Sequence, residues 1–231
     1  LREGLGSIMP NLLKPAIVAS VLAAIALSSN AHAGKLYEAF PKNIHANEKY
    51  VFYSHGFIVE GDNPTPISPR WGKYDFPLVK KALSDDEYNL IAYHRAKDTD
   101  PRLFAQKLAQ DIEHLVKRGV EHKNITLVGF SRGGAITALT SNQVKSDELN
   151  IVILAGCTKF LNNNKEVTVY GNVYSIYETS DGVGSCQGLI DRSKQVKRFE
   201  EIAISTGKEH GAFYNPLPEW LIPVKKWIKS P

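Results

Sequence analysis

The sequence predicts an α/β fold, a three-layer αβα sandwich in which helices cover both faces of a mostly parallel central sheet. Strand-like and helix-like segments alternate along most of the chain, which is the pattern of right-handed βαβ units. The most apolar strand-like runs do not alternate apolar with polar residues, as expected of strands buried on both faces. With 231 residues, 43% hydrophobic and 23% charged, the chain is long enough to bury one sizeable core, which excludes disordered and collagen-like proteins.

The charge of the chain argues against one class of partner. The formal net charge is only +4, and lysine and arginine are scattered among acidic residues rather than gathered in a stripe. We therefore expect no binding to nucleic acid.

Residues 1–33 are expected to be upstream sequence followed by a secretory signal peptide. Met9 is the single methionine, and after it come one lysine, an apolar run over residues 16–27 and a small-residue cleavage site that ends at Ala33. The apolar run is too short to cross about 30 Å of hydrocarbon. We expect translation from Met9, cleavage after Ala33, no stable membrane anchor, and one exported domain, periplasmic or secreted, over residues 34–231.

Six short runs of β-branched, aliphatic and aromatic residues are the predicted strands. Along the chain they are Tyr50–Ser54, Asn89–His94, Asn124–Phe130, Leu149–Ala155, Val167–Tyr177 and Glu201–Ser205. Apolar spacing, caps and stop signals predict four helices. These are Pro77–Leu83, a helix that begins at Pro101 and ends before Gly119, Gly133–Val144, and Trp220–Ile228, which contains Pro223.

A G-x-S-x-G pattern follows the third predicted strand directly and leads into a helix. Its fixed residues are Gly129, Ser131 and Gly133. A sharp strand-to-helix turn holds the serine in a strained conformation, and the glycines let the backbone approach closely there. Ser131 is therefore the predicted nucleophile.

With this context the chain resembles the α/β-hydrolase superfamily, over nearly the whole mature part. In that family a His-Gly pair follows an early strand, and the N–H of the next residue helps to form the oxyanion hole. Here the pair is His55-Gly56, so the resemblance implies that the backbone N–H groups of Phe57 and Arg132 are the two donors.

The triad of this family occurs in the order Ser, acid, His. Asp181 follows the fifth predicted strand and resembles the acid; His210 follows the sixth and resembles the histidine. In such a triad a neutral imidazole takes the proton of the serine, and the carboxylate orients the ring. The resemblance thus implies that Ser131, Asp181 and His210 are the catalytic residues.

Three further residues could fill these roles instead. Glu178 or Asp191 could supply the acid, since Asp181-Gly182 also matches an ordinary turn. His94, at the end of another predicted strand, could supply the base. No metal is expected, because three further histidines lack the spacing of metal ligands: His45, His114 and His122.

The surroundings of the predicted site are expected to be open. Residues 156–166 are too few for the helical lid or cap that the resemblance places at this connection, so we expect no cap domain and no interfacial activation. Trp71, Tyr74 and Phe76 are hypothetical substrate contacts, and core packing explains each of them equally well. The side chain of Arg132 either contacts an anionic substrate or, as is more common, forms a surface salt bridge.

The two cysteines, Cys157 and Cys186, are expected to form a disulfide. An oxidising compartment favours their pairing. Cys157 comes just after the fourth predicted strand and Cys186 five residues after Asp181, so neighbouring strands would place both at one edge of the sheet. The bond would brace the acid loop, which is the loop that carries Asp181. The alternative is two separate buried thiols.

Together these features predict an exported serine hydrolase that cleaves a small ester or related acyl substrate through an acyl-enzyme, with no cofactor. A peptidase, thioesterase or acyltransferase would use the same triad. The alternative from another class is a non-catalytic binding module on this fold, for cell-wall or carbohydrate ligands. The sequence carries no signal for an oligomeric state.

Overall fold

A seven-stranded sheet forms the centre of residues 34–230, which together with Leu1 are the part of the chain that this computed structural model describes. The strand order is β1-β5-β2-β6-β7-β8-β9, and each neighbouring pair is parallel. The expected parallel sheet is confirmed. The signal peptide and its cleavage after Ala33 lie outside the described residues.

Each of the six predicted strands is present, and the structure adds a short edge strand. The strands are β1 (Leu36–Tyr37), β2 (Tyr50–Ser54), β5 (Asn89–Ile91), β6 (Ile125–Phe130), β7 (Asn150–Leu154), β8 (Tyr170–Glu178) and β9 (Gln195–Ile204). β9 begins six residues before its predicted start, at the edge of the sheet. The first half of β9 is rich in charged, exposed residues, which commonly protect an edge strand from pairing with other chains. Because these residues are polar, this half of β9 lacks the apolar run by which the other strands were predicted.

The proline-rich segment Glu60–Trp71 is not wholly irregular. It contains β3 (Ile67–Ser68), which pairs antiparallel with β4 (Gly72–Lys73) in a small separate hairpin. Strands of two residues produce no periodic signal, so a sequence pattern does not reveal them.

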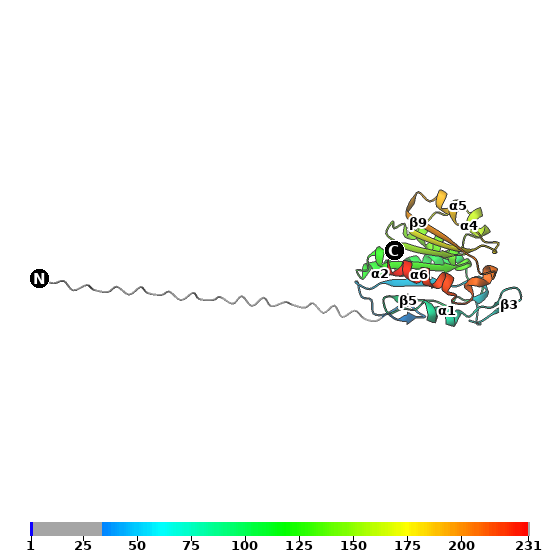
Figure 1. The fold of residues 1–231 in the computed structure, drawn as a ribbon, viewed down its shortest axis with the longest axis horizontal. Helices are drawn as coiled ribbons and strands as arrows, with labels where there is room; N and C mark the ends of the chain where they lie inside the picture. Colours follow the sequence, from blue (N-terminus) through cyan, green and yellow to red (C-terminus); the bar gives the residue numbers. More distant parts are fainter. Residues whose placement is uncertain (2–33, 231) are drawn as a thin grey trace. The chain divides into compact units, whose positions relative to one another are not determined.

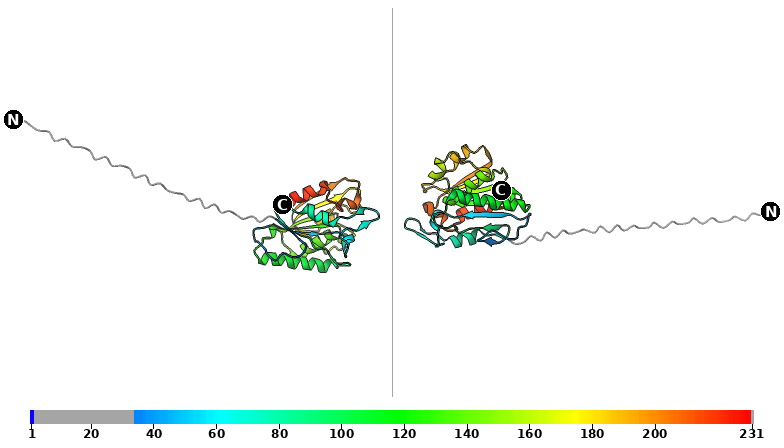
Figure 2. Two further views of the ribbon diagram at one scale, coloured as in Figure 1. Left: turned by 90° about the horizontal axis from the view of Figure 1, so that it is seen from below. Right: turned by 180° about the vertical axis from the view of Figure 1, so that it is seen from behind.

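Four main helices cover the two faces of the sheet (Figures 1 and 2). α1 (Phe76–Leu83) and α6 (Pro218–Lys229) pack on one face, and α2 (Pro101–Lys117) and α3 (Arg132–Val144) pack on the other. α2 begins where predicted because the carboxylate of Asp100 accepts hydrogen bonds from the first-turn N–H groups. Among residues 34–230, no helix is long and apolar enough to cross a membrane.

The strands carry apolar side chains on both faces, which explains their unbroken apolar runs. In β2, Val51 and Tyr53 belong to the cluster beneath α1 and α6, while Tyr50 and Phe52 belong to the cluster beneath α2 and α3. All four side chains are almost fully buried. The central strands are therefore covered by helices on both faces, as the three-layer prediction requires.

The parallel arrangement brings several loops to one edge of the sheet. The segments after β2, β6, β7, β8 and β9 all leave the carboxyl ends of neighbouring strands. The connection from β7 to β8 contains only the five-residue helix α4 (Lys159–Asn163), so the described chain holds no cap domain there.

Candidate active site

Ser131 occupies the sharp turn between β6 and α3. Its backbone has φ 54° and ψ −115°, a positive φ that side-chain-bearing residues rarely adopt. Its N–H donates to the carbonyl of Leu154 at the end of β7, with an N···O distance of 2.9 Å. The strained turn expected for a nucleophile is therefore present at this serine.

The glycines around Ser131 are required by close backbone contacts. A Cβ atom added at Gly129 would lie 2.1 Å from the carbonyl oxygen of Gly133, and one added at Gly133 would lie 1.9 Å from that of Ser54. At Gly134 an added Cβ would lie 2.7 Å from the Cα atom of Gly156. Side chains at these positions would push α3 away from the sheet.

Asp181 and His210 meet although 29 residues separate them. Nδ1 of His210 lies 2.6 Å from Oδ2 of Asp181, and both side chains are at most 10% exposed. Asp181 follows β8, and His210 lies in the 3₁₀ helix η3 (Glu209–Phe213) after β9. The structure thus brings the predicted acid and the predicted histidine together at the ends of two paired strands.

Aromatic rings hold the imidazole of His210 next to the serine turn. Its ring centroid lies 4.8 Å from that of Phe130, the residue before Ser131, and 5.2 Å from that of Trp71. Trp71 is held in turn by Glu209, which accepts from its indole Nε1 at 2.8 Å. Within the described residues, Ser131 makes no hydrogen bond to His210; such contacts are often long before substrate binds.

Glu178, the second candidate for the acid, has a different role. It is almost fully buried, and one oxygen accepts hydrogen bonds from the backbone N–H and the hydroxyl of Ser180. The other oxygen accepts from the N–H groups of Thr206 and Gly207, at 2.8 and 3.0 Å. Burial alone would raise the pKa of Glu178, but these hydrogen bonds outweigh it and lower the pKa to about 2. Glu178 therefore joins the acid loop, which carries Asp181, to the histidine loop, which carries His210.

The two predicted oxyanion donors each open a helix. Phe57 is the first residue of the 3₁₀ helix η1 (Phe57–Val59), and Arg132 is the first residue of α3. N–H groups at such positions have no partner within their helix. No oxygen atom of the described residues accepts a hydrogen bond from either group, so both remain available to a ligand.

Glu60 and Arg95 support the segment that carries Phe57. Glu60 ends η1, and its Oε1 lies 3.2 Å from Nε of Arg95 and 3.2 Å from Nε of Arg132. Arg95 donates from Nη2 to the carbonyl of His55 at 2.6 Å and from its backbone N–H to Nε2 of the same histidine. Burial and the charge of Arg95 hold the pKa of His55 well below its usual range, so His55 is a neutral structural residue.

His94 and Asp191 lie in other environments and do not join the pair of Asp181 and His210. Nε2 of His94 bonds to the carbonyl of Val59 at 2.7 Å, so this histidine supports the segment after β2. Asp191 ends α5 (Gln187–Asp191) and accepts a hydrogen bond from Gln187.

Two of the hypothetical substrate contacts are core residues instead. Tyr74 and Phe76 are fully buried, whereas Trp71 lies beside His210. The burial of Tyr74 and Phe76 depends on the tertiary packing, which an aromatic residue in a sequence does not reveal.

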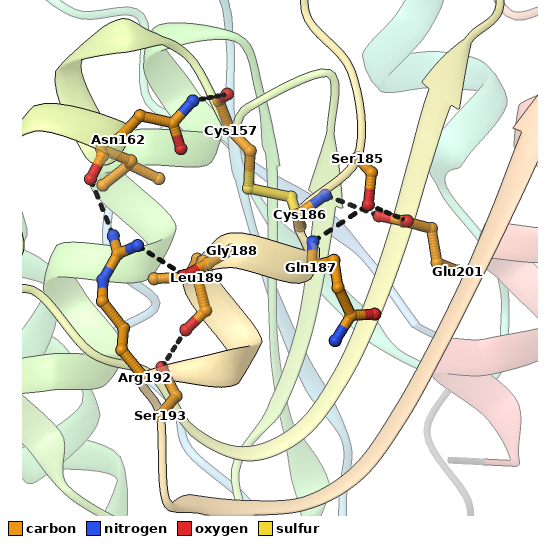
Figure 3. The surroundings of a disulfide bond; sticks show 11 residues. Cys157, Asn162, Ser185, Cys186, Gln187, Gly188, Leu189, Arg192, Ser193 and Glu201 are labelled. Carbon is orange, nitrogen blue, oxygen red and sulfur yellow. Dashed lines mark hydrogen bonds between the residues drawn. A yellow bond between two sulfur atoms is a disulfide. The ribbon is translucent and has the colours of Figure 1, made fainter.

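Cys157 and Cys186 form a disulfide, as expected (Figure 3). Cys157 follows β7 and Cys186 caps α5, so the bond joins the segment before α4 to the loop that carries Asp181. Arg192 adds noncovalent links, because its guanidinium donates to the carbonyls of Leu161 in α4 and Gly188 in α5, each at 2.7 Å.

Ser131 opens into a small cavity of about 210 Å³. A second cavity, of about 550 Å³, lies against the histidine loop and includes Arg70, Trp71 and Lys208. A cavity of about 990 Å³ among residues 35–45 contains none of the three predicted catalytic residues. No group of three or more metal-ligating side chains that suits a metal ion occurs within residues 34–230.

Comparisons with solved structures give clear fold neighbours at low sequence identity. Arabidopsis thaliana SOBER1 is 14% identical with a TM-score of 0.53, and the match covers 79% of this chain and 98% of that one. A CIB-like hydrolase from Thermoplasma acidophilum is 14% identical with a TM-score of 0.54, covering 82% and 90%. A monoacylglycerol lipase from Paleococcus ferrophilus is 15% identical with a TM-score of 0.52, covering 78% and 94%. No family model matches the sequence, and neither does any curated protein.

Proposed function

Since the chain has the α/β-hydrolase fold, we propose that it is an exported serine hydrolase that cleaves an ester or related acyl substrate. One observation carries this proposal: the strained Ser131 follows β6, and the hydrogen-bonded pair of Asp181 and His210 follows β8 and β9. Export is supported by the signal-peptide pattern of residues 9–33 and by the disulfide, which suits an oxidising compartment.

The hydrogen bond between Asp181 and His210 sets the direction of proton transfer. When Nδ1–H donates to Oδ2 of Asp181, the neutral ring keeps a lone pair on Nε2. This atom takes the proton of Ser131 as the hydroxyl oxygen attacks the acyl carbon, and Asp181 stabilises the imidazolium that forms. His210 then gives the proton to the leaving group, and water releases the acyl group from the serine by the same steps.

The reaction also requires stabilisation of the oxyanion, and the free N–H groups of Phe57 and Arg132 supply it. The carbonyl oxygen gains negative charge as the tetrahedral intermediate forms, and two fixed backbone donors stabilise it. The positive end of the α3 dipole acts in the same direction. Apart from the substrate and water, the proposed steps use only residues of this chain.

A variant at the nucleophile tests the proposal. We expect the protein to hydrolyse chromogenic esters and to bind a fluorophosphonate probe covalently, and we expect Ser131→Ala to lose the labelling. Its ester turnover should fall by a factor of about 10⁴ or more, as for other triad serines. Steady-state kinetics and gel fluorescence measure the two effects.

Ser146→Ala is the matched control, because Ser146 follows the opposite end of α3 and should leave both readouts unchanged. Turnover that persists in Ser131→Ala would show that Ser131 is not the nucleophile. A protein that neither turns over an ester nor takes the label would contradict the enzymatic proposal and favour a binding module on this fold.

A further inference from the structure

The small cavity beside Ser131 has an apolar lining. Ser131 shares it with Phe57, Pro101, Ala135, Thr158 and Phe160. Ala135 is one helical turn beyond the serine, and its N–H donates to the carbonyl of Ser131, so its methyl group and the nucleophile belong to the same turn of α3.

The one charged side chain of the lining is already engaged. The guanidinium of Arg132 lies 3.2 Å from Glu60, donates to the carbonyl of Thr99 at 2.7 Å and stacks 4.8 Å from the ring centroid of Phe57. Glu60 is shared with Arg95, so it offsets only part of the positive charge of the two guanidinium groups. No other lining residue is charged, so a cation entering the cavity would lose water without gaining a counter-ion, whereas an apolar group would lose little.

The cavity is also small. Its volume is about 210 Å³, and a cavity of about 150 Å³ in another protein is large enough to hold benzene. By this comparison an apolar chain of up to about eight carbon atoms, or one aromatic ring, fills the space.

The part of the lining that contains Thr158 and Phe160 is linked to two neighbouring segments. The disulfide at Cys157 ties the residue before Thr158 to the acid loop (Figure 3). The guanidinium of Arg102 lies 5.8 Å from the ring centroid of Phe160 and donates to Oδ1 of Asn164 at 2.9 Å. A longer chain would have to displace these contacts.

We infer that this cavity is the acyl site, and that the substrate carries a short, uncharged apolar acyl group of up to about eight carbons or a single aromatic ring. The inference rests on the proposed function. We expect Phe160 and Thr158 to set the upper limit of chain length, because they come from the segment that the disulfide and Arg102 hold in place.

The experiment compares p-nitrophenyl acetate, butyrate, octanoate, dodecanoate, palmitate and benzoate. We expect kcat/KM to be highest between butyrate and octanoate, with benzoate accepted, and to fall by about tenfold or more at dodecanoate. A profile that stays level or rises towards palmitate would overturn the inference.

Two variants change the lining at Phe160 and Thr158 in opposite directions. Phe160→Ala should raise the ratio of kcat/KM for dodecanoate over butyrate about tenfold, because removing the ring lengthens the cavity. Thr158→Phe should lower the ratio for octanoate over acetate by a similar factor, because the new ring fills it. If Phe160→Ala does not fold, Phe160→Leu replaces it, and it should raise the ratio of kcat/KM for dodecanoate over butyrate in the same direction.

Phe40→Ala is the matched control for the ring deletion. Phe40 lines the separate cavity among residues 35–45, so its removal should leave both ratios unchanged. If Ser131 takes the fluorophosphonate label but neither the Phe160 nor the Thr158 variant alters its ratio, the acyl-site inference is wrong and the proposed function stands. If Ser131 takes no label, the proposed function itself fails.

Discussion

Two buried glutamates brace opposite sides of the site, and they do so with different partners. Glu178 joins the acid and histidine loops, and every donor that it accepts from is a neutral N–H or O–H group. Glu60 supports the segment that carries Phe57, and its partners are the guanidinium groups of Arg95 and Arg132. The carboxylate of Glu178 is therefore stabilised mostly by backbone hydrogen bonds, whereas that of Glu60 is paired with two arginines.

The surroundings of the two glutamates differ in how many buried polar atoms have a hydrogen-bond partner. Around Glu60, three buried atoms lack a hydrogen-bond partner among the described residues: Oε2 of Glu60, Nη1 of Arg95 and Nε of Arg132. Both oxygens of Glu178 are satisfied. A change at Glu60 therefore leaves a buried cation without its counter-ion, whereas a change at Glu178 leaves unpaired neutral donors, which cost less.

The largest expected loss of stability follows from Glu60→Gln. It should lower the free energy of unfolding by about 3–5 kcal/mol, because Arg95 has a fully buried side chain and keeps its charge. Urea denaturation measures the change, and Glu113→Gln, at an exposed ion pair of α2, is the control. The paired variant Glu60→Leu with Arg95→Met should recover part of the loss, because it removes the fully buried cation and leaves only the partly exposed Arg132 unpaired; a double variant less stable than Glu60→Gln alone would contradict the buried-charge explanation.

The disulfide strengthens only the side that carries Glu178, and removing it should have the next largest effect. Cys157→Ser with Cys186→Ser opens a loop closed by residues 29 apart and should cost about 3 kcal/mol. Thermal unfolding with and without a reductant measures it: reductant should lower the Tm of the unmutated protein but not that of the double variant. An equal response of both proteins would show that the bond does not stabilise the fold.

Glu178→Gln should cost between about 2 and 3 kcal/mol at neutral pH. The amide would also turn an NH₂ group towards an N–H donor, so Asp181 and His210 should separate and kcat should fall with little change in KM. Ester kinetics measure this, with Glu200→Gln, an exposed glutamate of β9, as the control. An unchanged kcat would mean that Glu178 does not position Asp181 and His210.

The same residue predicts a dependence on pH. The pKa of Glu178 in the folded protein, about 2, lies below its unfolded value of about 4.3. Its contribution is therefore complete above pH ~5 and is lost as the pH falls towards ~2. The stability difference between the unmutated protein and Glu178→Gln should shrink over this range; a difference that stays constant from pH 6 to pH 3 would exclude this origin.

The smallest effect is expected far from both glutamates. Asp147 and Lys197 form an ion pair at 2.9 Å, but both side chains are more than half exposed. Solvent screens such pairs, so Asp147→Ala should leave the urea midpoint unchanged within error. A clear shift would show that surface charge contributes as much as the buried braces.

The local features of this protein were predictable from its sequence. Short runs of β-branched, aliphatic and aromatic residues predicted the strands, Asp100 predicted the start of α2, and the glycines around Ser131 predicted a strained turn. The pairing of Cys157 with Cys186 also followed, since chain order places both after neighbouring strands. Each of these signals lies within a few adjacent residues or follows from a simple rule of sheet topology.

Only the tertiary structure decided which polar residue has which role. Glu178 and Asp181 are three residues apart at the end of the same strand, and their difference arises from donors at residues 206–207 and from a ring at position 210. Likewise, Glu60 in a proline-rich loop acquires its role from Arg95 and Arg132. The environment of a carboxylate depends on groups that the fold brings from far along the chain. The sequence alone therefore determined the main strands and helices and the strained turn at Ser131, while long-range packing decided which carboxylate lies beside His210 and which residues surround the cavity.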